Sequence, residues 1–240
     1  MIGILVQIAL SWMLLRLIEQ KDLSVLGYCP VPKRIIQFII GVIFAGTLCA
    51  VIQIVDSWLT HLSWRINTEL SYRLIVESIW WNLKSILFEE FIFRGALLYI
   101  AIQRLGARNG IILSALSFGI YHWFSYGVIG NPVAMAIVFA TTMLFGLVWA
   151  YSFSATESMA LPVGLHLGWN YTFNSVFSKG PLGNQLFIPI KNENYSQLSG
   201  MAGLLSFLLP MVIVAMLSYG LARWLSEKRD HAASDKFDLK

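Results

Sequence analysis

The stretch IIQFIIGVIFAGTLCAVIQIVDSW at residues 35–58 decides the class of fold. It holds a single charged side chain, Asp56, which lies close to its end. A helix of about 20 predominantly apolar residues is long enough to span the hydrocarbon core of a bilayer. The stretch therefore predicts a transmembrane helix, and the rest of the chain follows the same pattern.

The composition of the whole chain agrees with a membrane protein. Hydrophobic residues make up 57% of the 240 residues and charged residues 12%, whereas soluble domains carry roughly 25% charged residues. This composition excludes soluble and disordered proteins. The net charge of +4 does not indicate nucleic-acid binding, because the basic residues lie between the hydrophobic runs and in the tail.

Six further hydrophobic runs accompany residues 35–58, and together they predict an all-α polytopic membrane helix bundle. We expect about seven transmembrane helices, or eight if a less hydrophobic segment also crosses. Lys and Arg collect on the cytoplasmic side of membrane proteins; with the N-terminus outside, 11 of them fall inside and 4 outside. This split favours an N-out/C-in orientation. The further runs lie at 1–18, 74–101, 110–125, 132–152, 158–177 and 201–224.

The organisation along the chain predicts one transmembrane domain at residues 1–225, with a motif-bearing core at about 74–177. Residues 73–104 are expected to form one helix of about 48 Å at 1.5 Å per residue. The segment 178–199 is expected to be a loop, or a lid over the site. Residues 226–240 predict a charged cytoplasmic tail that is disordered.

Ionisable residues inside membrane segments are costly and point to function. In the sequence Glu89-Glu90-Phe91-Ile92-Phe93-Arg94, Glu90 and Arg94 are four residues apart and favour an ion pair, which supports the structure. Glu89 faces elsewhere, on a polar stripe with Ser78, Asn82 and Ser85. A carboxylate in a cavity with apolar walls suits a general base.

Two further clusters lie on later hydrophobic segments. Phe118 and His122 share a helix face, and so do His166 and Asn170, whose stripe Asn174 extends. His122 fits either a core position or the site. The His166 and Asn170 side chains can donate hydrogen bonds to an oxyanion, or hold helices together.

The depths of these residues along their helices predict that they meet. Glu89 lies about 21 Å from the inner end of its helix, His122 about 18 Å and Asn170 about 18 Å, at 1.5 Å per residue. His166 lies about 12 Å from the same side. Three separate segments therefore bring polar groups to a similar depth.

The order of the motifs EExxxR, FxxxH and HxxxN, at residues 89–94, 118–122 and 166–170, resembles the CPBP family. This family comprises the CAAX proteases and bacteriocin-processing enzymes, also called Abi proteins, which are intramembrane endopeptidases. The segment Phe145-Gly146-Leu147-Val148 is similar to the small-residue helix between the second and third motifs. The resemblance covers about residues 83–177.

The resemblance implies a role for each motif residue. Glu89, assisted by His122, would activate water; His166 and Asn170 would form the oxyanion hole; Glu90 and Arg94 would support the site. The older view of the family as zinc enzymes implies a His₂Glu set made of Glu89, His122 and His166. We expect no cofactor, because no HExxH motif is present and asparagine is an unusual zinc ligand; zinc stays the alternative.

The expected activity is hydrolysis of a peptide bond in a membrane-associated or lipidated peptide or protein. The expected partners are the lipid bilayer and such a substrate, with no nucleic acid. The expected location is a membrane that the chain crosses several times, which is the plasma (inner) membrane in a bacterium. A non-catalytic membrane scaffold or immunity protein and a proton-coupled transporter are the alternatives.

Overall fold

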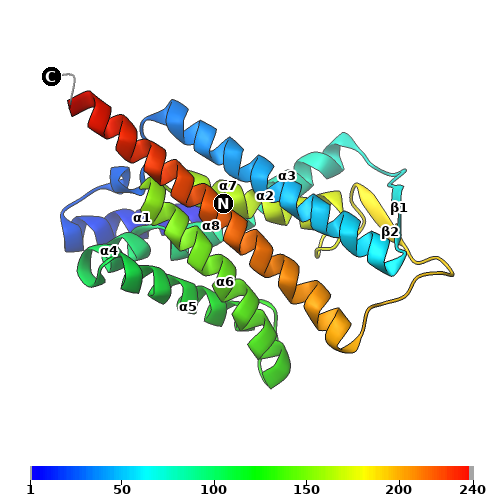
Figure 1. Ribbon diagram of the computed structural model, residues 1–240. Helices are drawn as coiled ribbons and strands as arrows, with labels where there is room; N and C mark the ends of the chain where they lie inside the picture. Colours follow the sequence, from blue (N-terminus) through cyan, green and yellow to red (C-terminus); the bar gives the residue numbers. More distant parts are fainter. Residues whose placement is uncertain (1, 238–240) are drawn as a thin grey trace.

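The computed structural model describes residues 2–237, with side chains as far as Lys228, and it is mostly helical (Figure 1). Three short helical turns extend or connect the longer helices: η1 (Leu15–Glu19), η2 (Leu23–Leu26) and η3 (Thr172–Val176). The longer helices are α1 (Ile2–Leu14), α2 (Val31–Thr60), α3 (Tyr72–Phe93), α4 (Ala96–Leu105), α5 (Ala107–Ser125), α6 (Pro132–Thr156), α7 (Ala160–Tyr171) and α8 (Gly200–Phe237).

Local sequence explains where the helices of the site begin. Ser71 precedes α3, and its side chain accepts a hydrogen bond from the backbone N–H of Leu74. Asn131 caps α6 in the same way, accepting from the N–H of Ala134, with Pro132 in the first turn. These side chains satisfy backbone donors that the first turn of a helix leaves without partners.

Within the described residues, four helical segments are long and apolar enough to cross a membrane. Each coincides with one of the expected hydrophobic runs. The helices α3, α5 and α7 also match expected runs but are outside this set, so the expected number of spans and their orientation stay predictions. The four segments are Ile2–Glu19, Leu23–Thr60, Pro132–Thr156 and Gly200–Lys228.

The helix expected over residues 73–104 is in fact two helices. The α-helical backbone ends at Phe93, and α4 begins at Ala96. A Cβ atom on Gly95 would lie 2.2 Å from the backbone oxygen of Phe91, so glycine allows the chain to turn here. The hydroxyl of Ser114, on α5, donates to the freed carbonyl of Phe93 at 2.7 Å. A hydrogen bond from α5 therefore satisfies a backbone carbonyl that the helix break leaves without a helical partner.

The segment 178–199 is not only a loop. Its residues Phe187–Ile190 form a strand, β2, which pairs antiparallel with β1 (Ser63–Ile66). The indole of Trp64, on β1, donates to the hydroxyl of Ser57 and packs edge-on against Phe177 at 5.1 Å. This small sheet lies far from the end of α8 (Figure 1), and it is an addition to an otherwise helical fold.

The C-terminal segment also differs from the expectation. The helix α8 continues through the charged tail to Phe237, where we expected disorder from residue 226. Residues 238–240 lie outside the described part of the chain. In Figure 1, α8 runs diagonally across the bundle, and it packs against α6 and α2.

The closest helix contact joins α2 and α7, and glycines make it possible. A Cβ atom on Gly164 would lie 2.3 Å from the backbone oxygen of Phe38, and one on Gly168 would lie 2.2 Å from that of Val42. Small residues four positions apart allow two membrane helices to approach backbone to backbone. This contact fixes one side of α7, and His166 and Asn170 lie on its other side.

We expect Gly168→Ala to lower the thermal unfolding temperature in detergent and the amount of protein in the membrane. The added methyl group has no room beside Val42, and overpacking of this kind costs typically 1–3 kcal/mol. Gly220→Ala in α8 is the matched control, because nothing lies within 4 Å of its Cβ position. Equal unfolding temperatures for the two variants would contradict the role given to the α2–α7 contact.

Candidate active site

Two consecutive glutamates at the end of α3 point in different directions. The side chain of Glu90 is fully buried, whereas that of Glu89 is 14% exposed. Glu89 lines a cavity of about 370 Å³. The other residues that line this cavity are Gly3, Ile4, Trp81, Lys84, Ser85, Phe88 and Tyr121.

Glu90 is held by two partners. Arg94 Nη1 donates to Glu90 Oε1 at 3.2 Å, and His166 Nδ1 lies 2.8 Å from the same oxygen. Arg94 is itself fully buried, 4.2 Å above the ring of Phe118, and its Nη2 donates to the backbone oxygen of Gly146 at 3.4 Å. Removing one partner of such a buried ion pair is strongly destabilising, which agrees with the supporting role expected for Glu90 and Arg94.

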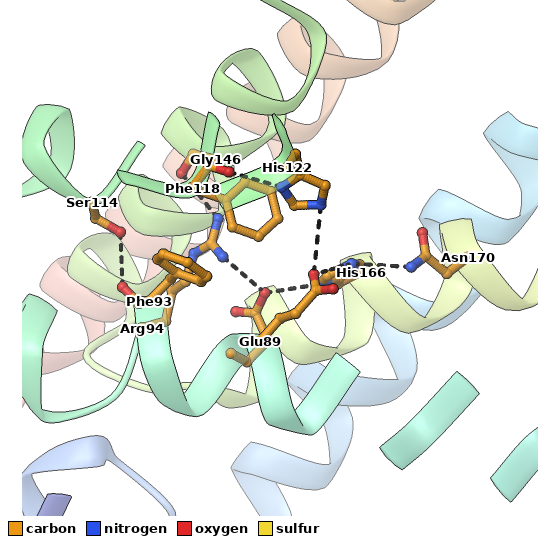
Figure 2. A network of polar contacts seen from close by, with 10 residues as sticks. Glu89, Phe93, Arg94, Ser114, Phe118, His122, Gly146, His166 and Asn170 are labelled. Carbon is orange, nitrogen blue, oxygen red and sulfur yellow. Dashed lines mark hydrogen bonds and ion pairs between the residues drawn. The ribbon is translucent and has the colours of Figure 1, made fainter. Parts of the chain in front are cut away.

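His122 faces Glu89 from α5. Its Nδ1 lies 2.7 Å from the backbone oxygen of Phe118, and its Nε2 lies 3.9 Å from Glu89 Oε2 (Figure 2). A carbonyl oxygen only accepts hydrogen bonds, so Nδ1 must carry the proton in that contact. The neutral ring then presents the lone pair of Nε2 towards Glu89.

His166 approaches the same carboxylate from α7, and Asn170 contacts His166 from the same helix. His166 Nε2 lies 3.7 Å from Glu89 Oε2 and 3.1 Å from Asn170 Nδ2. Glu90 at Nδ1 orients the ring, and the indole of Trp149 stacks on it with the centroids 3.9 Å apart. The imidazole is therefore fixed on two sides, as Figure 2 shows for its polar contacts.

The expected convergence is found for most of the residues singled out from the sequence. Glu89, Glu90, Arg94, His122, His166 and Asn170 form one connected group. Asn174 does not join it: the π-helical turn η3 changes the helical register, and Asn174 Nδ2 donates instead to Asn82 Oδ1 at 2.9 Å. Asn82 also donates to Ser175 at 2.9 Å, so this part of the polar stripe ties α3 to η3.

The sequence did not single out Trp149, which lies against His166. The helix that carries it, α6, is apolar on all sides, so periodicity could not show which face meets the site. The contact of the nearby Gly146 carbonyl with Arg94 becomes visible only in the structure. The segment around Gly146 is similar to a family helix, but this similarity does not identify Trp149 as a neighbour of His166.

The arrangement can hold and polarise a water molecule. Glu89 Oε2 and His122 Nε2 are both acceptors and lie 3.9 Å apart. A water molecule at hydrogen-bond distance of about 2.8 Å from each would donate one hydrogen to each, leaving its lone pairs free. Such a water is a suitable nucleophile next to a general base.

A zinc site made of Glu89, His122 and His166 does not fit the observed contacts. In the part of the chain that the structure describes, no group of three His, Cys, Asp or Glu side chains is placed to hold a metal ion. Asn170 Nδ2 faces the Nε2 lone pair of His166, which is the lone pair that zinc would need. We therefore derive no step through a metal.

Comparison with known proteins bears directly on this region. A protein-family model described as type II CAAX prenyl endopeptidase Rce1-like matches residues 72–172. Neither a curated protein nor a solved structure matches the chain. The matched segment runs from the start of α3 to the end of α7 and contains all three motifs. Residues 72–172 are thus similar to the Rce1-like type II CAAX prenyl endopeptidases, which agrees with the family that the three motifs resemble.

Proposed function

We propose that this chain is an intramembrane endopeptidase that hydrolyses a peptide bond of a membrane-associated or lipidated substrate, with Glu89 as the general base. One observation carries the proposal: Glu89 Oε2 lies in a cavity, 3.7 and 3.9 Å from the Nε2 atoms of two histidines on other helices. Side chains from three helices thus meet at one carboxylate oxygen. The family of residues 72–172 supports the same class of reaction.

In the proposed reaction, water between Glu89 and His122 attacks the carbonyl carbon of the substrate. The new C–O bond forms as one proton of the water moves to Glu89, and the carbonyl oxygen becomes an oxyanion. When the tetrahedral intermediate collapses, the C–N bond breaks and Glu89 returns the proton to the departing amine. General acid–base catalysis of this type contributes about 10²–10⁴-fold to a rate.

The oxyanion is held by His166 and Asn170 in this proposal. The amide nitrogen of Asn170 is a donor, and it already faces the reacting side of His166. His166 donates from Nε2 when both ring nitrogens carry a proton, and Glu90 at Nδ1 is the counter-charge for that form. In that form Nε2 no longer accepts from Asn170, and both side chains donate to the oxyanion instead. Donors of this kind stabilise the charge that develops during acyl transfer.

We propose that the reaction needs no resident metal, and we expect 1,10-phenanthroline to change the rate of hydrolysis less than about twofold, because the catalytic proton transfers use side chains. The measurement is hydrolysis by purified protein in liposomes, with and without the chelator, alongside metal analysis of the same sample. An inhibition that added zinc reverses would favour the His₂Glu alternative.

We propose that the chain crosses the membrane seven or eight times, and that the four apolar helices are four of these spans. The N-terminus lies outside and the C-terminus inside. This topology would place the chain in the plasma (inner) membrane of a bacterium. The distribution of Lys and Arg supports the orientation. Labelling of single cysteines introduced into the loops of a cysteine-free variant, from each side of the membrane, tests it.

The experiment that tests the proposed function compares all N- and C-terminal peptides of membranes that carry the wild type or Glu89→Gln at matched expression. We expect a set of cleavage products that occurs only with the wild type, and these products name the substrate. Glu77→Gln is the control, because it is the same change on an exposed part of α3. Identical peptide sets for all three proteins would favour the scaffold or transporter alternative.

A further inference from the structure

A second cavity, of about 560 Å³, opens on the side of the bundle between α2, α3 and the start of α7. We call it the lateral groove and define it by five of the residues that line it: Val31, Ile35, Phe38, Phe91 and Val163. Val31 and Ile35 are 53% and 52% exposed, so the groove is open along one edge. Because α2 lies in one of the four segments that can cross a membrane, this edge faces lipid.

The lateral groove is separate from the active-site cavity. Leu87 and Phe91 line the groove, and Glu89 lines the active-site cavity. Residues two positions apart on an α-helix point in nearly opposite directions, because each residue turns the helix by about 100°. The two cavities therefore lie on opposite sides of α3, and an occupant of the groove does not touch the reacting groups.

The depth of the lateral groove fits a hydrocarbon chain of one membrane leaflet. Its wall on α2 runs from Val31 to Phe38, which is a rise of about 10.5 Å at 1.5 Å per residue. One leaflet contributes about 15 Å, half of the hydrocarbon core of a bilayer. The groove thus begins at the end of the bundle and reaches about two thirds of the way to the middle of the membrane.

The mouth of the groove carries an oriented cation. Arg34 lines the groove, its Nε donates to the backbone oxygen of Cys29 at 3.1 Å, and its Nη1 donates to Gln37 Oε1 at 2.9 Å and to the backbone oxygen of Thr156 at 3.0 Å. These three acceptors are neutral, so the contacts orient the guanidinium without removing its charge. Tyr28, 54% exposed, lines the mouth as well, and tyrosine is enriched at the level of lipid headgroups.

The end of the bundle at which the groove opens has an excess of positive charge. This is the end opposite the β1–β2 sheet (Figure 1). Among the residues with described side chains, it carries eight basic and four acidic groups, whereas the end with the sheet carries four of each. The eight are Arg16, Lys21, Lys33, Arg34, Arg104, Arg108, Arg223 and Lys228, and the four are Glu19, Asp22, Glu157 and Glu227. Such a surface attracts anionic lipid headgroups.

We propose that the lateral groove is a binding site for an anionic phospholipid, which places one acyl chain against Phe38, Phe91 and Val163 and its phosphate at Arg34. The apolar wall recognises the chain, and the guanidinium forms charge-assisted hydrogen bonds with the phosphate oxygens. The chain packs against α3 and α7 together, and Val163 precedes His166 by three residues. The lipid therefore stabilises the arrangement of the two helices that carry the candidate site, and its binding does not depend on the proposed endopeptidase activity.

Thermal unfolding of the purified full chain in a neutral detergent tests the site. The probes are phosphatidylglycerol and phosphatidylcholine with identical acyl chains, because a ligand that binds only the folded protein raises its unfolding temperature. We expect phosphatidylglycerol to reach half of its maximal effect at a concentration about 10-fold lower than phosphatidylcholine, as for a hydrogen bond between charged groups. Glycerol 3-phosphate, which has no chain, should have no effect; an equal effect would assign Arg34 to free phosphate and overturn the proposal.

Two pairs of variants separate the headgroup from the chain. Arg34→Gln is expected to abolish the preference for phosphatidylglycerol, and Arg108→Gln, which removes an exposed charge at the same end of the molecule, should retain it. Ala160→Phe fills the groove and should abolish the effect of both lipids, whereas Ala140→Phe on an exposed face of α6 should leave both effects unchanged. The second pair keeps Arg34 in place, so it decides the question even if Arg34→Gln fails to fold.

Three results would overturn the proposal. The first is equal stabilisation of the wild type by the two phospholipids, and the second is an unchanged lipid response in Ala160→Phe. The third concerns the occupant: if a farnesylated peptide displaces a photoactivatable phosphatidylglycerol from the peptides that carry Phe91 and Val163, the groove holds a lipidated substrate instead. Glu89→Gln should keep the full lipid response, because the groove lies on the other side of α3. Loss of hydrolysis and loss of lipid binding are thus measured independently.

Discussion

Glu89→Gln is expected to slow peptide hydrolysis by about 10²–10⁴-fold, the contribution typical of a general base, while the protein still folds. Glutamine has nearly the same size as glutamate, so the walls of the cavity keep their shape. Its amide cannot accept the proton of the attacking water. The measurement is the single-turnover rate of purified protein in liposomes, with a substrate identified from the membrane peptides.

The control for this prediction is Glu77→Gln on the same helix. The side chain of Glu77 is 58% exposed and pairs with Arg73, so the substitution removes a charge without touching the cavity. We expect its rate to stay within about twofold of the wild type, because exposed ion pairs contribute little. Equal rates for Glu89→Gln and the wild type would remove Glu89 from the mechanism.

Arg94→Met is expected to destabilise the protein by about 3–5 kcal/mol, the cost of breaking a buried ion pair by removing one partner. The substitution leaves the carboxylate of Glu90 buried with His166 as its remaining partner. It also removes the guanidinium from its place above Phe118 and from the carbonyl of Gly146. The measurement is thermal unfolding in detergent, together with the yield of folded protein.

Two comparisons make the Arg94 prediction sharp. Arg73→Met breaks an ion pair of the same spacing on the same helix, but one whose side chains are 86% and 58% exposed, so we expect a change below about 1 kcal/mol. The double variant Glu90→Gln/Arg94→Met removes both buried charges and should be more stable than Arg94→Met alone. If Arg94→Met unfolds at the same temperature as Arg73→Met, the ion pair does not support the site.

Much of the fold could be predicted from hydrophobic runs, because each run must be long enough to cross a bilayer. The run at 35–58 lies inside α2 (Val31–Thr60), and that at 132–152 lies inside α6. The break at Gly95 could not be read in this way. Residues on both sides of it are apolar, so hydropathy continues through the turn, and the carbonyl of Phe93 is satisfied by Ser114 from another helix.

The grouping of the site residues was predictable for a similar reason. Helical spacing separates the direction of Glu89 from that of Glu90, and the order of the motifs indicated the resemblance to a family. The contacts of Trp149 with His166 and of Asn174 with Asn82 were beyond such reasoning. The first joins two helices with no fixed register between them, and the second depends on the π-helical turn η3, which periodicity based on 3.6 residues per turn does not describe.

The close packing of α7 against α2 affects how inactive variants of this protein should be interpreted. One side of α7 has no room for a methyl group at Gly164 or Gly168, while the opposite side carries His166 and Asn170. A displacement of about 1 Å in catalytic groups can cost about 100-fold in rate. A mutational screen scored by turnover alone would therefore count these glycines as catalytic, although they contact only a neighbouring helix. Measuring the abundance of each variant together with its activity separates the packing glycines from the residues proposed to take part in catalysis.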